Sequence, residues 1–365
     1  MPAPRHAAPR PAVEVAEVSE TLERALLGRP ATMGRREVSR GAGVSIRSAR
    51  KFWHAMGFPL VSEDDAMFTE ADLAALAGVA ELVRSGAVDE DFALSMTRAL
   101  ARTMDRLAIW QTQLVAEEIA EEIAEEIAEP GRAGDEAADL AASPEVAREA
   151  ALRLTAMVDD LEPLLVYVWR RQLTAAINRG LNDAPGEDGQ GAPRVIGFAD
   201  LVNFTAVVRR LTERELAQMV QRFEVLATDI VTAHGGRVVK TVGDEVMFLT
   251  VGVAPAAAIA LDLVEAMSEE PLLPDARVGM AHGPVVNRLG DVFGVTVNRA
   301  SRLTAVAPAN GVFVDDALAR LLAPLSGFST VRTRQRTLRG IGTVTPSRLV
   351  RVTGVRDRSD APEHL

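Results

Sequence analysis

The chain has 365 residues, which is enough for two domains that each bury their own core. The absence of cysteine from the sequence excludes disulfide bonds and thiolate catalysis, and the net charge of −11 argues against a general binder of nucleic acid or membrane surfaces. The sequence has no uncharged apolar run of roughly 18 residues that could span a membrane, and residues 1–16 lack the apolar core of a signal peptide. These features predict a cytoplasmic protein.

A polar stretch, NDAPGEDGQGAPR, divides the chain and has the composition of a flexible linker. Helical periodicity dominates before this stretch, whereas short β-rich runs alternate with helical segments after it. The expected organisation is a flexible N-terminus at 1–18, an all-α domain at 19–181, a linker at 182–193, an α+β domain at 194–353 and a charged tail at 354–365.

Several polar residues and prolines mark helix ends in the first half. Thr69 is expected to cap one helix, and Ser143 with Pro144 forms an N-cap and N1 pair that opens a helix reaching about Asn178. Pro163 is expected to bend or interrupt this helix, because proline removes a backbone hydrogen bond.

Residues 116–129 read AEEIAEEIAEEIAE, a low-complexity acidic helix. Its isoleucines lie four residues apart, off the helical repeat of about 3.6 residues, so the apolar stripe should wrap around the helix. Its glutamates lack basic partners at i+4 and should raise one another's pKa values, so mild acidification would strengthen the helix and could act as a signal. The alternative is an ordinary solvated helix face whose charges are screened by salt.

The strongest helix signal in the second half runs from Thr212 to His234, and Glu215 completes a capping box at its start. Short β-rich runs lie on both sides of it. They are residues 194–198, 237–242, 245–251, 277–281 and 311–314, followed by a closing hairpin within 331–352. The order of these elements predicts an α+β sheet covered by helices on one face.

Two carboxylates follow predicted strands. Asp200 ends the first apolar run, and Asp244 lies in a Gly-Asp turn between two Val-rich runs. If the strands are neighbours, both carboxylates meet at one edge of the sheet and repel one another unless a hard cation such as Mg²⁺ or Mn²⁺ neutralises them. The alternative is that Asp200 caps the following helix and Asp244 is only a turn residue.

Three further residues suggest phosphate or nucleotide chemistry. Asn298 and Arg302 lie four apart, so they share a helix face on which Arg can bind phosphate and Asn can orient a hydroxyl group. The alternative is a pair of ordinary surface residues on an amphipathic helix. Lysine occurs only at Lys51 and Lys240 among 40 basic residues, so Lys240, four residues before Asp244, suggests a need for a compact ammonium group.

Three motifs stand in a fixed order in the second half: FADLVNFT at 198–205, HGGRVVKTVGDEVMF at 234–248 and GDVFGVTVNRASRL at 290–303. Together with LRGIG at 338–342 and RLVRV at 348–352, they resemble the catalytic domain of the class III nucleotidyl cyclases over about residues 194–352. The resemblance implies a ferredoxin-like or palm-like βαββαβ core and an adenylyl cyclase that converts ATP into cyclic AMP.

The resemblance also implies a metal site. Asp200 and Asp244, with the backbone carbonyl of Leu201, would hold two divalent cations, Mg²⁺ or Mn²⁺. These cations would bind the triphosphate and activate the ribose 3′-hydroxyl group.

The remaining site residues are assigned by the same resemblance. Lys240 and Asp291 would bind the adenine base, Asn298 would position the ribose, and Arg302 would stabilise charge on the α-phosphate. The family builds each site across a dimer interface, which implies that this chain forms a homodimer with two sites.

Other nucleotide enzymes fit less well. Guanylyl cyclases usually carry Glu and Cys or similar residues where this chain has Lys240 and Asp291, so ATP is favoured as the substrate. Diguanylate cyclases have a double-Gly signature that Val242–Glu245 lacks, and they do not explain Asn298 and Arg302. The intact set of six side chains disfavours a pseudo-enzyme that binds nucleotide without turnover.

Residues 37–58 resemble the start of a MerR-like winged helix-turn-helix, and residues 1–54 carry ten basic against five acidic residues. The alternative function is therefore a DNA-binding regulator that uses the cyclase domain as a nucleotide sensor. The same resemblance is found in helical regulatory domains of soluble bacterial adenylyl cyclases. It therefore favours an autoinhibitory domain, with protons or a lipid as possible effectors, and disfavours DNA as a partner.

Overall fold

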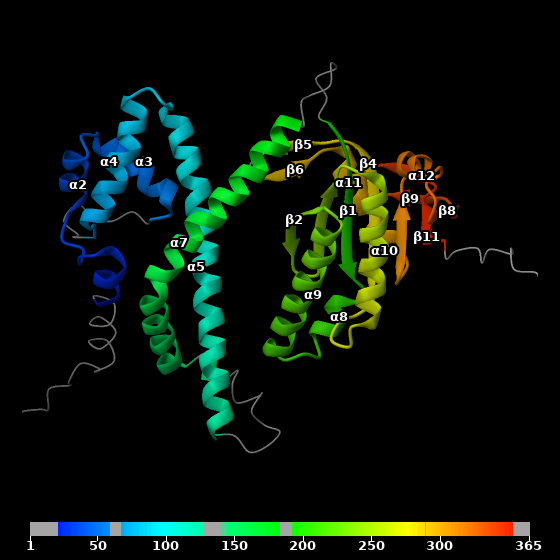
Figure 1. Ribbon diagram of the computed structural model, residues 1–365, viewed down its shortest axis with the longest axis horizontal. Coiled ribbons are helices and arrows are strands. Elements are labelled where there is room, and N and C mark those ends of the chain that lie inside the picture. The colour runs from blue at the N-terminus through cyan, green and yellow to red at the C-terminus, as the bar shows by residue number, and fades with distance from the viewer. Residues whose placement is uncertain are drawn as a thin grey trace, which may run out of the picture. The chain divides into compact units, whose positions relative to one another are not determined.

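The structure is a computed structural model that describes residues 21–58, 67–127, 140–141, 143–182, 192–288 and 290–352. The chain divides into two compact units, Met1–Ala175 and Ala176–Leu365, and the division falls inside helix α7 (Figure 1). The predicted flexible N-terminus, most of the predicted linker and the predicted charged tail lie outside the described residues. Among the described helices, none is both long enough and apolar enough to cross a membrane.

The first part of the N-terminal unit packs short helices around a small core. It contains α2 (Arg35–Gly41), α3 (Ile46–Met56) and α4 (Glu70–Arg84). Thr69 caps α4 in a capping box with Asp72, which confirms the predicted helix start. The core residues are Val38, Ala42, Ala49, Phe52, Trp53, Phe68 and Leu76. The resemblance of α2 and α3 to a MerR-like motif stays a prediction.

Two long helices, α5 (Glu90–Ile127) and α7 (Pro144–Asn182), complete the helical part of the chain. The Ser143 hydroxyl accepts a hydrogen bond from the Val146 amide at 3.2 Å, so the predicted cap of α7 is confirmed. Pro163 lies inside α7 and does not interrupt it. The two helices pack through a cluster of buried residues: Val115, Ile119, Ala120, Ala124, Val146 and Ala150.

The acidic repeat on α5 differs from its prediction at Glu122. Arg153 of α7 donates to both carboxylate oxygens of Glu122, at 3.1 and 2.9 Å. This hydrogen bonding lowers the pKa of Glu122, whereas the sequence predicted a raised value. The prediction was wrong at this residue because the basic partner comes from another helix, 31 residues away in sequence, and not from the i+4 position.

The second unit is built on a seven-stranded sheet in the order β2-β3-β1-β4-β7-β11-β8. Its strands are β1 (Pro193–Leu201), β2 (Arg237–Val242), β3 (Glu245–Thr250), β4 (Ala276–Pro284), β7 (Gly311–Val314), β8 (Phe328–Arg332) and β11 (Ser347–Arg351). The first four strands form antiparallel neighbours in the order β4-β1-β3-β2, which is the ferredoxin-like arrangement of a βαββαβ core. Strand β7 then joins β4 in parallel.

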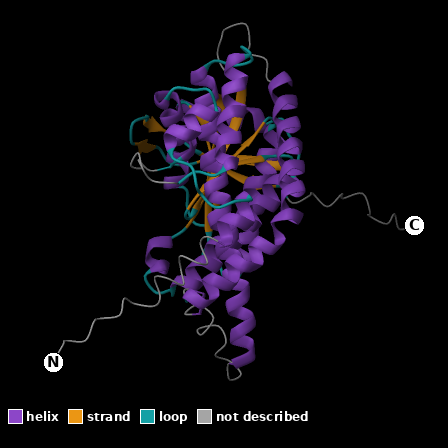
Figure 2. Cartoon of the chain, turned by 90° about the vertical axis from the view of Figure 1, so that its left-hand side faces the viewer, coloured by secondary structure: helices purple, strands orange, loops and turns teal. Residues whose placement is uncertain are grey.

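Helices cover both faces of this sheet, so the expectation of helices on one face was wrong. Figure 2 draws the helices in purple and the strands in orange. Against one face lie α9 (Glu213–Ala233), α10 (Val253–Glu269) and α12 (Asp316–Leu322), and against the other lies α11 (Val295–Val306). Val195 of β1 packs with α10, whereas its neighbour Ile196 packs on the side of Ala300 in α11. A strand buried on both faces has a continuous apolar run, which is the pattern that β1 shows.

Short elements complete the second unit. They are α8 (Phe204–Val208) and the strand pairs β5 (Val286–Arg288) with β6 (Asp291–Phe293) and β9 (Arg336–Leu338) with β10 (Gly342–Val344). Strand β8 pairs with β11 around the β9–β10 pair, so the predicted closing hairpin is confirmed.

Candidate active site

Asp200 and Asp244 lie at the same end of the sheet. Asp200 is the second-last residue of β1 and stands opposite Glu245 of β3 in the antiparallel register. Asp244 occupies the tight turn between β2 and β3, where Gly243 adopts a φ of 60° that favours glycine. The Leu201 amide donates to the Asp244 carbonyl at 3.1 Å. The structure therefore brings the two carboxylate residues and Leu201 to one edge of the sheet.

Arg277 of β4 holds the Asp200 carboxylate, a contact that the sequence analysis missed. Arg277 stands directly opposite Asp200 in the register of β1 and β4, and its Nε donates to Asp200 Oδ2 at 2.7 Å. Its Nη2 donates to the same oxygen. No local sequence signal marks this pair, because the two residues are 77 apart and meet only through strand register.

Lys240 and Asp291 form an ion pair between β2 and β6. The Lys240 ammonium donates to Asp291 Oδ2 at 2.7 Å, and the Val292 amide donates to Asp291 Oδ1 at 2.7 Å. Burial acts to raise the pKa of Asp291, but these two hydrogen bonds outweigh it and lower the pKa below its ordinary value. The pair therefore presents an ionised donor and acceptor side by side, 51 residues apart in sequence.

Asn298 and Arg302 lie on α11 and are both exposed. Within the described residues, neither side chain makes a hydrogen bond or an ion pair. No such bond joins them to Asp200 or Asp244 in this part of the chain. The structure thus presents them as free polar groups on one helix.

The family model of the adenylate and guanylate cyclase catalytic domain matches residues 193–349. An adenylate cyclase of Glutamicibacter nicotianae is 36% identical over 92% of this chain and 83% of its own length, and one of Streptomyces coelicolor is 37% identical over 95% and 94%. A pH-sensitive adenylate cyclase of Mycobacterium tuberculosis is 32% identical over 84% of this chain and 75% of its own length. The chain belongs to the class III adenylyl cyclase family. Neither the family match nor these relatives support the DNA-binding alternative.

The end of the sheet that carries Asp200, Asp244 and Glu245 has an excess of negative charge. Burial raises the pKa of Asp200, Arg277 opposes the rise, and the nearby Asp244 carboxylate adds to it. Burial and then the charges of Asp200 and Asp244 raise the pKa of Glu245. Crowded carboxylates of this kind are stabilised by a divalent cation.

The donor set of the cyclase fits Mg²⁺ or Mn²⁺. Hard cations of this type commonly bind through one or two carboxylates together with substrate phosphates, and not through a complete protein cage. Asp200 and Asp244 would supply two carboxylates to such a cation, and the backbone at Leu201 would add a carbonyl oxygen. Within the described parts of the chain, no group of three or more acidic or histidine side chains is arranged to hold a metal alone.

Proposed function

We propose that this cyclase converts ATP into 3′,5′-cyclic AMP and pyrophosphate in the cytoplasm. The observation that supports ATP is the ion pair of Lys240 and Asp291, with Nζ and Oδ2 2.7 Å apart. An ammonium group can donate to adenine N1 and a carboxylate can accept from the 6-amino group, whereas guanine presents the reverse pattern at these positions. The pair therefore favours adenine over guanine.

The proposed reaction needs no protein nucleophile. The ribose 3′-oxygen attacks the α-phosphorus in line, the bond from that phosphorus to the bridging oxygen of pyrophosphate breaks, and the 3′-hydroxyl proton passes to solvent. Asp200, Asp244 and the Leu201 carbonyl would hold two divalent cations, which when bound would neutralise the triphosphate and lower the pKa of the 3′-hydroxyl group.

The other residues bind and orient the substrate in this proposal. Lys240 and Asp291 bind the base, and Asn298 positions the ribose. Arg302 donates to the α-phosphate, whose negative charge increases in the transition state.

We further propose that the active form is a homodimer in which α11 of one copy completes the site of the other. The exposed and unpaired side chains of Asn298 and Arg302 support this proposal. Val286 and Phe293 are opposite each other in the β5–β6 pair and both are exposed, as is the nearby Val295. Exposed apolar groups at the start of α11 are suited to contact with another protein chain.

A product assay tests the proposed reaction. Full-length protein with Mg²⁺ or Mn²⁺ should form cyclic AMP from ATP and little cyclic GMP from GTP. Asp200→Asn and Asp244→Asn should each nearly abolish turnover while circular dichroism shows normal folding. Wild-type protein that forms no cyclic AMP, or either variant at normal activity, would contradict the proposal.

Regulation by the N-terminal half is part of the same proposal. We propose that the helical domain at 19–181 restrains the catalytic domain at 194–353 and responds to a lipid or to protons. A cavity of about 220 Å³ lies between α3, α4 and α5, with apolar side chains inside and Arg84 and Glu90 among its lining residues. An apolar cavity with a few charged groups is suited to an amphiphile. The pH-sensitive relative supports protons as the other candidate.

Substitutions of two alanines on α4 test whether a lipid is the effector. Ala80 lines the cavity, whereas Ala74 is exposed on the same helix and is absent from the lining. A long-chain fatty acid should change the activity of wild-type protein and Ala74→Trp but not of Ala80→Trp, which fills the cavity. Equal responses from all three proteins would contradict the lipid assignment, and a flat pH–activity profile of the wild type would contradict protons.

A further inference from the structure

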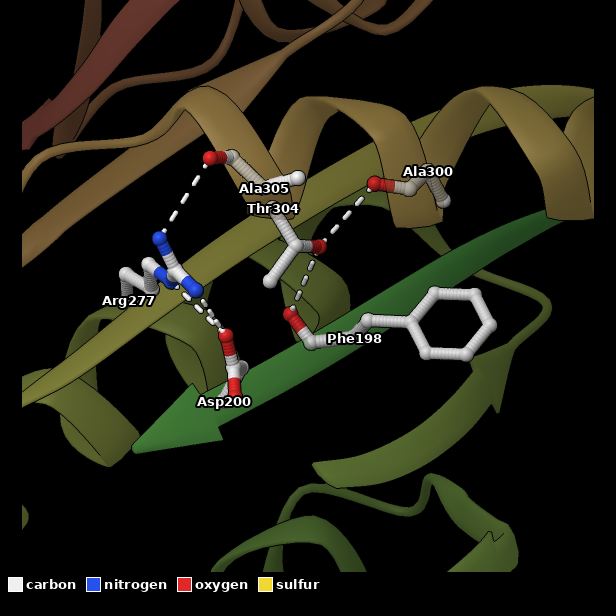
Figure 3. A network of polar contacts seen from close by, with 6 residues as sticks. All are labelled: Phe198, Asp200, Arg277, Ala300, Thr304 and Ala305. Carbon is white, nitrogen blue, oxygen red and sulfur yellow. Dashed lines mark hydrogen bonds and ion pairs between the residues drawn. The ribbon is translucent and has the colours of Figure 1, made fainter. Parts of the chain in front are cut away.

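We propose that Arg277 is a positioning residue of this cyclase, which fixes the Asp200 carboxylate for a divalent cation and links it to helix α11. This inference rests on the proposed metal-binding role of Asp200. Figure 3 shows Arg277 between the end of β1 and the last turn of α11, with donors directed to both elements.

The first observation is the geometry of the ion pair. Both Nε, at 2.7 Å, and Nη2 of Arg277 donate to Asp200 Oδ2, so Oδ1 stays outside the pair. A carboxylate has several acceptor sites, and a guanidinium group that occupies one oxygen sets the orientation of the other. Only 29% of the Arg277 side chain and 15% of the Asp200 side chain are exposed, so the surrounding strands also restrict the two groups.

The second observation is the link to α11. Arg277 Nη1 donates to the Ala305 carbonyl at 3.3 Å. Ala305 lies in the last turn of α11, where carbonyl groups lack partners within the helix and favour a cation. It is three residues beyond Arg302, so the same guanidinium group contacts Asp200 and the helix that carries Arg302.

The third observation is that α11 is also attached to β1. The Thr304 hydroxyl lies 3.4 Å from the Phe198 carbonyl and 3.0 Å from the Ala300 carbonyl (Figure 3). Phe198 precedes Asp200 by two residues on β1, so the two contacts lie on the same side of the strand's end. The strand that carries the metal-binding carboxylate and the helix that carries Arg302 are therefore held together at neighbouring points.

The charge and the shape of arginine are both needed for this role. A neutral side chain at 277 would leave Asp200, Asp244 and Glu245 crowded without their counter-ion, and no group would orient Asp200. Lysine would keep the charge, but one ammonium group cannot reproduce two donors to Asp200 and a third to α11. Removal of a group that orients a metal ligand costs roughly 10- to 100-fold in metal affinity or activity.

The test uses full-length Arg277→Met and Arg277→Lys, with Arg222→Met as the control. Arg222 pairs with Glu270 at 2.6 Å, and among the described residues neither side chain bonds to Asp200, Asp244 or Arg277, so its loss removes an ion pair that does not include them. Binding of Mn²⁺ is measured by electron paramagnetic resonance in the presence of 3′-deoxy-ATP, which lacks the attacking hydroxyl group. The Mn²⁺ dependence of kcat and the KM for ATP are measured in parallel, and thermal melting reports folding.

Arg277→Met should weaken Mn²⁺ binding and raise the half-saturating Mn²⁺ concentration by roughly 10- to 100-fold. Arg277→Lys should lie between Arg277→Met and the wild type, and Arg222→Met should match the wild type in both measurements. Folded Arg277→Met with unchanged Mn²⁺ binding and dependence would overturn the proposal. If Arg277→Met does not fold, Arg277→Lys decides: binding equal to wild type overturns the proposal and weaker binding supports it. Because 3′-deoxy-ATP does not react, the binding measurement stands even if the proposed cyclase reaction fails.

Discussion

Lys240 and Asp291 form a surface ion pair that we propose binds the adenine base. The chain's lysines both pair with carboxylates: Lys240 Nζ lies 2.7 Å from Asp291, and Lys51 Nζ lies 3.0 Å from Glu90. Both lysine side chains are 44% exposed, so neither pair is expected to contribute much to stability. What distinguishes Lys240 is its position beside the turn that carries Asp244.

Lys240→Ala should therefore lower kcat/KM for ATP while leaving the melting temperature nearly unchanged. Loss of a hydrogen bond to a charged group costs about 1.5–3 kcal/mol, which corresponds to roughly 10- to 150-fold. Lys51→Ala is the matched control and should leave the KM for ATP at the wild-type value. Steady-state kinetics of both variants test this prediction. A Lys240→Ala protein with the wild-type KM for ATP would show that the base is bound elsewhere.

At the scale of residues, sequence could propose Asp200, Asp244, Lys240, Asp291, Asn298 and Arg302, because each belongs to a motif with a characteristic spacing. Arg277 could not be proposed in this way. It is one of many arginines, and its proposed role comes from its position opposite Asp200 on a strand that is distant in sequence. The lowered pKa of Glu122 was missed for the same reason, since Arg153 is on another helix.

Helix α11 is the element on which the proposed site depends most. It packs closely on β4, because Gly279 leaves no side chain between the strand and the helix. A Cβ at Gly279 would press on the Thr304 amide and lie 2.7 Å from the Ala300 carbonyl oxygen. Only glycine at position 279 leaves enough space for α11 to pack on β4 in this way.

Gly279→Ala should displace α11, lowering both the melting temperature and kcat. Overpacking of a tight interior typically costs about 1–3 kcal/mol. Gly78→Ala is the control, because Gly78 lies in α4 with open space around its Cβ position and alanine there should be neutral or slightly stabilising. Thermal melts and initial rates test this, and a Gly279→Ala protein as stable and active as wild type would refute the close-packing argument.

The acidic repeat on α5 gives a pH prediction. The hydrogen bond from Arg153 holds the pKa of Glu122 below its ordinary value, so the pair is fully formed above the pKa of an unfolded glutamate and is lost only as the pH falls through the lowered value. Glu122 therefore stays ionised between about pH 6 and 8. Glu122→Gln and its exposed neighbour variant Glu125→Gln should both keep the wild-type midpoint of the pH–activity profile. A midpoint shifted by Glu122→Gln alone would identify that residue as the sensor.

At the scale of elements, the sequence predicted most strands and helix caps correctly. Residues 237–242 and 311–314 match β2 and β7, and Thr212 with Glu215 forms the predicted capping box. The second helical layer was missed. Helix α11 buries only Thr296, Ala300, Leu303 and Thr304, so its apolar face is too weak to predict that it covers a sheet.

At the scale of the whole molecule, the proposed site is divided between two sets of side chains that no described hydrogen bond or ion pair joins directly. Asp200 lies near the end of β1 and Asp244 lies in the turn between β2 and β3, whereas Asn298 and Arg302 are exposed on α11 without partners among the described residues. A homodimer resolves this arrangement if each site takes its carboxylates from one copy and its α11 residues from the other. Symmetry then gives two identical sites.

Complementation between two inactive variants is the most direct test of this account. Asp200→Ala and Arg302→Ala should each be nearly inactive alone. In a mixed dimer one site carries both changes and the other carries neither, so an equal mixture of freely exchanging chains should recover about a quarter of wild-type activity. Recovery of cyclic AMP formation is the predicted result. Mixed dimers that are shown to form and yet remain inactive would contradict the shared site.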